Sequence, residues 1–459
     1  MFDSSGPSFV HLDVRSYFSL KDGAFSPEEL AARAAELSMP AVALTDRDGL
    51  YGAPRFAAAC ARTGVRPIFG TTLTIRGPGP APARPADTSV VLLARDARGY
   101  ANLCRLITDA HLGGERGDPH AFVAQILAHA DGLACLLGPR SAPGLLAAAG
   151  RAEEAAAAAR PYREAFGRWA FVSVEHRLEE DAHREIRGML RLAGDAGLRA
   201  LATNGVRYLV PEDAFLADAL ECMRELVPLA SHHVSRRNAE GYLKDARRMR
   251  ALFAERPGLC DAAVALAEAC DVDLGIGTVH FPDFPTPRGK SAGSVLAERC
   301  RRGMEDRGVR PTREVVDRLN HELSMIQTMG YAAYFLTVAD IVTDVRAMGI
   351  RIACRGSAAG SLVCYLTRIS DVDPVRHGLL FERFINPGRD DLPDIDVDVE
   401  SARREDVYDM ILSRYGEDRC ACVNMVETYR ARAALREVGK ALGYPEVEID
   451  VVAKAFPHI

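Results

Sequence analysis

Short apolar runs alternate with helical patterns in the first part of the chain. Strands are predicted at His11–Ser16, Ala41–Asp46 and Val65–Ile75, and helices from about Pro27 to Leu37 and from about Ala53 to Cys60 lie between them. Strands separated by helices at this spacing are typical of parallel βαβ units. The pattern therefore predicts an α/β domain at the start of the chain.

The same alternation continues further along the chain. The Pro/Ala-rich run Gly77–Asp87 predicts a surface loop, and the apolar run Ser89–Arg95 after it predicts a strand. A strand at Ala200–Asn204 then leads into a long helical stretch that reaches about Val272. A single α/β domain over residues 1–275 accounts for these elements.

A change of composition marks the end of this domain. Prolines and glycines accumulate at Gly277–Lys290 with little periodicity, as expected of a connector. Helices then lead to the turn Ala353–Leu362 and to the strand-like Leu392–Val399, after which the pattern becomes helical again. We expect a second domain at 276–426 and the start of a third, helical one at 427–459.

Composition narrows the class of protein. The 459 residues are 48% hydrophobic, enough for several buried cores, and the 11 cysteines form no CxxC pair, which indicates a cytoplasmic protein without disulfides. No apolar run approaches the roughly 20 residues of a membrane helix, so we expect no membrane partner. The formal net charge of −6 gives no overall basic footprint, so any contact with nucleic acid depends on a local group of cations.

The strand-like end of the second domain carries three alternate carboxylates, Asp394, Asp396 and Asp398. Side chains alternate between the two faces of a strand, so all three are expected on one face, with Ile395 and Val397 behind them. Oxygen ligands on a rigid strand suit Mg²⁺, which takes one or two protein carboxylates beside substrate phosphates. An acidic, solvated strand edge or a calcium-type loop is the alternative.

A glycine-rich turn precedes this strand in the sequence. Arg355-Gly356-Ser357 follows an apolar run, and a helix is predicted after it. Backbone N–H groups of the turn and the dipole of that helix are therefore expected where a phosphate could bind. The turn is neither a Walker loop nor a GxGxxG motif, so an ordinary tight turn with a helix cap is the alternative.

These motifs stand in a distinctive order. The run RGSAAGSLVCYLTRISDVDPVRHGLLFERFINPGRDDLPDIDVDV, with MGYAAYFLTVADIV before it and RARAALREVGKALG after it, closely resembles the palm of bacterial DNA polymerase III alpha subunits. RNAEGYL and RPGLC carry the resemblance back into the first domain, so it covers essentially the whole chain.

The resemblance implies a nucleotidyltransferase palm similar to that of polymerase beta. Asp396 and Asp398 would hold two Mg²⁺ ions, and Arg355, Gly356 and Ser357 would lie at the phosphates of an incoming dNTP. The family's third palm carboxylate and its fingers would follow Ile459, so we expect this chain alone to be inactive. Implied partners are primer-template DNA, dNTPs and, for the full-length family, the sliding clamp and other replication or mutasome proteins.

Three cations recur at helical spacing in the last domain. Arg432, Arg436 and Lys440 stand at i, i+4 and i+8 and form a basic stripe. In the thumb of the family such a stripe would lie along duplex phosphates, so we expect it to bind DNA. An ordinary solvated helix face is the alternative.

The resemblance also makes the first domain a PHP domain, a fold that in some relatives binds three metal ions. The expected ligands are largely replaced here. The opening HxHxH motif reads His11-Leu12-Asp13-Val14-Arg15, and the later positions read Asp46-Arg47, Thr72, Ser173 and Asn204-Gly205-Val206-Arg207. Only His11, Asp46 and His111 remain, and fixed arginine charges stand where cations should bind. We expect a structural PHP domain without metal.

The predicted fold class is thus α/β multi-domain. A PHP-type α/β barrel-like domain precedes a polymerase-beta-like palm and the start of a helical thumb. The predicted function is template-directed DNA synthesis by nucleotidyl transfer, and the degraded PHP ligands with the run LTDRDGLYGA favour the error-prone type used in damage tolerance. The alternatives are a PHP phosphoesterase or exonuclease, and a non-catalytic fragment that binds DNA or partner proteins.

Overall fold

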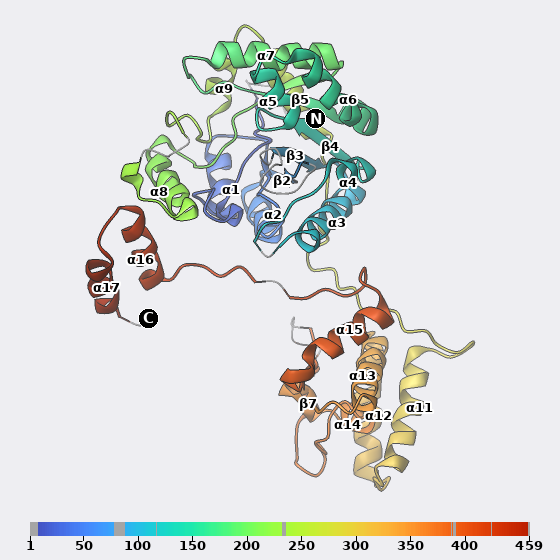
Figure 1. The fold of residues 1–459 in the computed structure, drawn as a ribbon. Helices are drawn as coiled ribbons and strands as arrows, with labels where there is room; N and C mark the ends of the chain where they lie inside the picture. Colours follow the sequence, from blue (N-terminus) through green and yellow to red (C-terminus); the bar gives the residue numbers. More distant parts are fainter. Residues whose placement is uncertain are drawn as a thin grey trace. The chain divides into compact units, whose positions relative to one another are not determined.

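The computed structural model describes residues 8–77, 88–115, 117–231, 236–386, 388, 392–423 and 425–457. Two compact units are present (Figure 1): Met1–Ile276 together with Val426–Ile459, and Gly277–Met425. Residues 426–459 thus pack with the first unit. The division into three domains at 275 and 426 stays a prediction.

A six-stranded sheet forms the centre of the first unit. Its strands follow one another in chain order: β1 (Ala41–Leu44), β2 (Arg66–Ile75), β3 (Thr88–Ala94), β4 (Leu133–Leu137), β5 (Ala170–Glu175) and β6 (Arg199–Thr203). The pairs β1–β2, β4–β5 and β5–β6 are parallel, whereas β2–β3 and β3–β4 are antiparallel.

The expectation of parallel βαβ units is confirmed for β1 and β2, which are parallel and have α2 between them. Strand β3, after the Pro/Ala-rich run, is antiparallel to both of its neighbours. Strand β3 returns beside β2 without a helix between them among the described residues, and antiparallel neighbours need no long crossover. Most of the predicted loop at Gly77–Asp87, namely residues 78–87, lies outside the described residues.

Most helices of this unit lie around the sheet (Figure 1). The helices are α1 (Pro27–Glu36), α2 (Ala53–Thr63), α3 (Ala97–Gly113), α4 (Val123–Ala128), α5 (Ala142–Ala148), α6 (Ala152–Phe166), α7 (Ala182–Ala196), α8 (Ala214–Glu225), α9 (Ala246–Leu252), α10 (Gly258–Glu268), α16 (Ala431–Ala441) and α17 (Glu446–Ala455). Helices α16 and α17 lie away from the sheet, with α16 beside α8. Helix α1 begins where the sequence predicts, because Ser26 and Glu29 form a capping box around Pro27.

The predicted first strand, His11–Ser16, is an extended segment that joins the two edges of the sheet. The carbonyl of His11 accepts from the N–H of Ala43 in β1 at 2.9 Å. The N–H of Val206, just after β6, donates to the carbonyl of Asp13, also at 2.9 Å. Val14 and Val206 form a single parallel bridge. The sheet therefore curls into a barrel-like half-cylinder, and the side chains of Asp13 and Arg15 lie where its edges meet.

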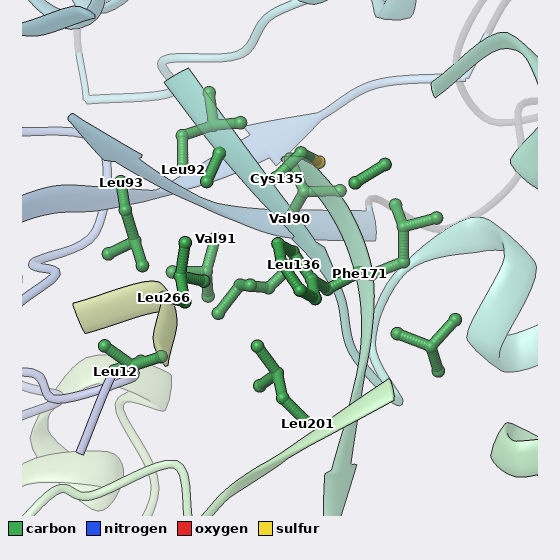
Figure 2. Close-up of a cluster of buried hydrophobic side chains, with 14 of the residues drawn as sticks. Leu12, Val90, Val91, Leu92, Leu93, Cys135, Leu136, Phe171, Leu201 and Leu266 are labelled. Carbon is green, nitrogen blue, oxygen red and sulfur yellow. The ribbon is translucent and has the colours of Figure 1, made fainter. Parts of the chain in front are cut away.

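The core of the first unit is apolar and lies against the sheet. Figure 2 shows Leu12, Val91, Leu136, Phe171 and Leu201 in one cluster of buried side chains from the opening segment and four strands. Neighbouring strands contribute to this one cluster, so the packing of these side chains depends on how the sheet curves.

The second unit is mainly helical with one short ladder. Its elements are α11 (Ala292–Asp306), α12 (Arg313–Thr328), α13 (Ala332–Ala347), β7 (Ile352–Arg355), α14 (Leu362–Leu366), β8 (Asp396–Val399) and α15 (Arg404–Tyr415). Strands β7 and β8 are antiparallel, and the core below them contains the fully buried Phe335 and Phe381.

Within the described residues, no single helix has the length and apolar character needed to cross a membrane. Helices α12 and α13 meet that test only as a pair, and a bend of 111° separates them.

Candidate functional site

The three carboxylates of the second unit lie as the strand pattern predicts. Asp394, Asp396 and Asp398 are exposed, and Ile395 and Val397 between them are half-buried. The polar face of this segment therefore presents a row of carboxylate oxygens, while the apolar face packs on the unit.

Pairing of β7 with β8 brings the glycine-rich turn to this row. Arg355 stands opposite Asp396, and Ala353 stands opposite Asp398. The Nε of Arg355 lies 3.2 Å from Oδ1 of Asp398, in an exposed ion pair. Gly356 has a φ of +72°, and a Cβ there would lie 3.2 Å from Oδ2 of Asp396. A residue without a side chain thus lets the carboxylate approach the turn.

The prediction that the helix after the turn offers its dipole to a phosphate is wrong. Its first turn is already occupied, because the fully buried Glu322 accepts from the backbone N–H of Leu362 at 3.0 Å and of Val363 at 3.1 Å, and from Ser361 Oγ at 2.8 Å. Helix α14 is also only five residues long. A phosphate would therefore meet Gly356 and Ser357 rather than this helix.

Arg318, one helical turn before Glu322 on α12, completes this support. Its Nε donates to Oε1 of Glu322 at 2.6 Å, and its Nη2 donates to the carbonyls of Gly360 at 2.9 Å and of Leu379 at 3.1 Å. The pair thus ties both ends of the segment 360–379 to α12. Sequence reasoning missed it, although a glutamate on the apolar face of a helix four residues after an arginine was the available signal.

The start of the carboxylate row is held by Tyr334 on α13. Its hydroxyl accepts from the backbone N–H of Ile395 at 2.9 Å, and its ring packs on Phe281 with centroids 5.3 Å apart. Burial, together with Asp394 and Asp396, raises the pKa of Tyr334. The hydroxyl therefore stays protonated and neutral beside the carboxylates.

A pocket of about 890 Å³ opens beside the turn. Gly356, Ser357 and Asp394 line it, together with Arg383 and Asn386. Its volume falls within the range of about 300–1,000 Å³ that is usual for ligand sites. Arg383 and Asn386 belong to the run LLFERFINP, to which the sequence analysis gave no role, and they add a cation and an amide to the predicted site.

The carboxylate row by itself is not a complete ligand set for a metal ion. In the part of the chain that the structure describes, no three or more His, Cys, Asp or Glu side chains are grouped to hold a metal. Asp396 and Asp398 are exposed hard oxygen donors at alternate positions of one strand. Such a pair fits Mg²⁺, which completes its shell with water and substrate phosphates.

The predicted basic stripe faces the neighbouring helix. Arg432 donates to the carbonyl of Phe456 at 2.7 and 2.9 Å, Arg436 Nε lies 3.1 Å from Oδ1 of Asp450, and Lys440 lies 3.9 Å from Glu446. All three cations therefore join α16 to α17 and its ends. Their contact with DNA stays a prediction.

A second site is a cavity of about 280 Å³ in the first unit. Thr72 and Ser173, which stand at expected metal-ligand positions, line it. At its floor lies Asp22, whose side chain is 1% exposed and forms ion pairs with Arg15 at 2.9 Å, Arg47 at 3.0 Å and Arg207 at 3.3 Å. Arg224 is 3.5 Å away. Three of these arginines are the ones that replace expected metal ligands.

The backbone around Asp22 is strained. Leu20 and Lys21 have φ values of 33° and 65°, and a Cβ at Gly23 would lie 2.2 Å from the carbonyl of Arg15. Left-handed conformations of this kind cost about 1 kcal/mol or more each in residues other than glycine. The strain is balanced by the ion pairs of Asp22, a residue that the sequence analysis did not single out.

Charge, rather than solvation, determines the ionisation of Asp22. Burial alone would raise its pKa, but Arg15, Arg207, Arg47 and Arg224 hold the pKa well below its usual range. The carboxylate is therefore ionised at all ordinary pH values. It supplies the negative charge that the arginines need in place of solvent.

The remaining metal-ligand remnants bind the protein itself. His11 Nε2 lies 2.8 Å from the carbonyl of Lys244, and burial lowers the pKa of His11 to about 4. Asp46 accepts from the N–H of Ser16 and the hydroxyl of Ser19, both at 2.7 Å, and burial raises its pKa to about 6. His111 Nε2 lies 2.8 Å from the carbonyl of Asp48.

Comparisons with known proteins match two families along the chain. Residues 294–459 match the family model described as the bacterial DNA polymerase III alpha NTPase domain, and residues 11–175 match that of the PHP domain. An error-prone DNA polymerase of Symbiobacterium thermophilum is 39% identical, covering 98% of this chain and 42% of that protein. DNA polymerase III subunit alpha of Caulobacter vibrioides is 36% identical, and the alignment covers 100% of this chain and 41% of that protein.

A second error-prone DNA polymerase, from Mycolicibacterium paratuberculosis, is 37% identical and covers 98% of this chain and 42% of that protein. The chain thus spans about two fifths of the length of the curated relatives it matches. An amidohydrolase structure from Chromobacterium violaceum aligns over 44% of this chain at 16% identity, with a TM-score of 0.30, which is too low for any inference about this chain.

The fold is mixed α/β, with a match to the PHP domain at residues 11–175 and a match to the polymerase III alpha model at residues 294–459. The chain belongs to the bacterial DNA polymerase III alpha family. Membership implies dependence on divalent metal ions.

Replacing Glu322 by Gln should loosen the turn. Because Arg318 would remain half-buried without its carboxylate, we expect a loss of about 3–5 kcal/mol in the free energy of unfolding of the second unit. Hydrogen exchange should be faster in peptides that cover residues 361–370. The control is Glu314→Gln, an exposed change on the same helix that should leave exchange unchanged. Unaltered protection in E322Q would contradict the proposed support.

Replacing Asp22 by Asn should destabilise the first unit by about 3–5 kcal/mol at neutral pH, since the arginines would lose their shared anion. The folded pKa of Asp22 lies below its unfolded value, so its stabilisation is complete above pH about 4 and is lost as the pH falls through the folded pKa. The difference in the free energy of unfolding between wild type and D22N should therefore become smaller at acid pH.

Urea unfolding followed by the fluorescence of Trp169, the single tryptophan, measures this difference. Asp131→Asn, which removes only an exposed partner of Arg98, should leave the curve unchanged. A D22N deficit that is constant from pH 7 to pH 3 would show that the ionised carboxylate is not the source of the stability.

Proposed function

We propose that this chain forms the nucleotide- and metal-binding part of a template-directed DNA polymerase. One observation carries the proposal: strand pairing brings the Gly356 turn beside Asp396 and Asp398. Gly356 and Ser357 of the same turn line a pocket of about 890 Å³ together with Asp394. Family membership supplies the reaction class. The geometry supports the assignment of these residues to it.

Asp396 and Asp398 are the proposed ligands of two Mg²⁺ ions, which when bound activate the primer hydroxyl and stabilise the leaving group. The dNTP would enter beside Gly356 and Ser357, where a backbone without a Cβ permits close approach of phosphates. Arg355 now pairs with Asp398 and would turn its guanidinium to the triphosphate, since the pair is exposed and weak.

The proposed reaction is nucleotidyl transfer. The primer 3′-oxygen forms a bond to the α-phosphorus of the dNTP, the bond from that phosphorus to the bridging oxygen breaks, and pyrophosphate leaves with the electron pair. The hydroxyl proton passes to solvent. The residues described here position the triphosphate and the ions for this step.

Primer-template DNA and dNTPs are the proposed substrates, with the sliding clamp and other replication or mutasome proteins as partners of the longer polymerase. We assign the chain to the error-prone type acting in the cytoplasm, because an error-prone relative is 39% identical and the PHP ligands are replaced. Arg432, Arg436 and Lys440 would reach DNA phosphates by exchanging their present partners on α17 and its ends for the duplex.

The PHP domain is proposed to be a metal-free scaffold. Arg15, Arg47 and Arg207 surround Asp22 where a metal-dependent phosphoesterase would need ligands, so the geometry disfavours the hydrolase alternative.

Primer extension with Mg²⁺ and dNTPs tests the polymerase proposal. The full-length product of the gene should extend a primer, and the double substitution Asp396→Asn with Asp398→Asn should lower the rate at least about 1,000-fold, because both metal ligands lose their charge. Asp317→Asn, an exposed carboxylate on α12, is the control and should retain the rate. A folded full-length protein that cannot extend a primer would refute the proposal.

A further inference from the structure

The floor of the cavity in the first unit holds more positive than negative charge. Arg15, Arg47, Arg207 and Arg224 share the single carboxylate of Asp22. Arg15 also lies 3.7 Å from Asp13, and Arg224 lies 3.0 Å from Glu225. Arg47 and Arg207 have Asp22 as their acidic partner within the described residues, so one carboxylate serves both of these cations. Burial and the neighbouring arginines lower the pKa of Arg207 to about 10. Asp22 acts in the opposite direction and raises this pKa.

Arg140 adds a further cation to the same cavity. It follows strand β4, lines the cavity, and has no side-chain hydrogen bond or ion pair with the rest of the described chain. Burial and the nearby Arg15 and Arg47 lower the pKa of Arg140. A guanidinium held near like charges without a carboxylate of its own leaves room for an anion from outside.

Several buried donors around the cavity also lack an acceptor. The Nε–H groups of Arg15, Arg177 and Arg207 are shielded from solvent and have no hydrogen-bond partner among the described residues. Arg15 is only 3% exposed, so water does not readily replace a partner. Two buried acceptors of the same cavity, Asp13 Oδ1 and Asp22 Oδ1, also have no hydrogen-bond partner among the described residues. Unsatisfied buried polar groups are rare in native proteins, and a group of them around one cavity indicates that a polar ligand or water completes their hydrogen bonds.

The size of the cavity limits the identity of that acceptor. At about 280 Å³ it lies just below the usual range for ligands of drug or nucleotide size, about 300–1,000 Å³. Guanidinium groups match the oxygen pairs of phosphate and sulfate, to which they donate two parallel hydrogen bonds.

We propose that this cavity binds a small tetrahedral oxyanion of the phosphate class, held by Arg15, Arg140 and Arg207. The anion occupies the place where a metal-binding PHP domain would keep its ions. The site is independent of the polymerase proposal, because it rests only on residues of the first unit.

Isothermal titration of the chain with inorganic phosphate at pH 7.5, with sodium chloride at matched ionic strength as the blank, tests the proposal. Wild type should bind one phosphate and gain thermal stability from it. Arg140→Gln should weaken binding by about tenfold or more, because one charge-assisted contact is lost. Arg140 forms no side-chain hydrogen bond or ion pair with the described residues, so this variant should fold. Arg105→Gln, an exposed arginine on α3, is the matched control and should bind as wild type.

Three results would contradict the proposal. Without a site, phosphate acts only through ionic strength, so a binding heat and a thermal stabilisation equal to those with chloride refute the site. Equal affinity in wild type and R140Q refutes the assigned residues. A parallel titration with dATP separates the sources: binding of dATP that depends on Arg140 and exceeds that of phosphate would contradict a small-anion site.

Discussion

Each candidate site depends on a buried carboxylate that is paired with arginine. In the first unit Asp22 gathers four guanidinium groups, and in the second Glu322 joins Arg318 to the first turn of α14. A charge removed from water must be paired and hydrogen-bonded, so each carboxylate fixes the position of every group that neutralises it. The cavity in one unit and the glycine turn in the other are consequences of these contacts.

The local part of the second site could be predicted from the sequence. Alternation along a strand is a local rule, so Asp394, Asp396 and Asp398 were expected on one face, and they are exposed together. The approach of Gly356 to Asp396 could not be derived from spacing, because it depends on antiparallel pairing between segments forty residues apart in the chain. The order of the motifs suggested the link only through the family resemblance.

Long-range contacts explain what sequence reasoning missed. Asp22 stands in a polar loop with no motif around it, and its importance appears only when Arg47 and Arg207 reach it from distant strand ends. Likewise, Glu322 occupies the N–H groups that an isolated strand, turn and helix would offer to a phosphate. The antiparallel direction of β3 could not be predicted from the alternation of apolar and polar positions either, since a helix between two strands does not by itself make them parallel.

Cleavage of the chain by hydroxyl radicals from bound Fe²⁺, with ascorbate and peroxide, tests most directly whether Asp396 and Asp398 form the metal site. Iron replaces Mg²⁺ at oxygen ligands and cuts the backbone nearby. The account predicts cuts close to both 355–357 and 396–398, lost in the D396N/D398N double variant and suppressed by excess Mg²⁺. Cuts confined to the first unit, or a pattern unchanged in the variant, would contradict it.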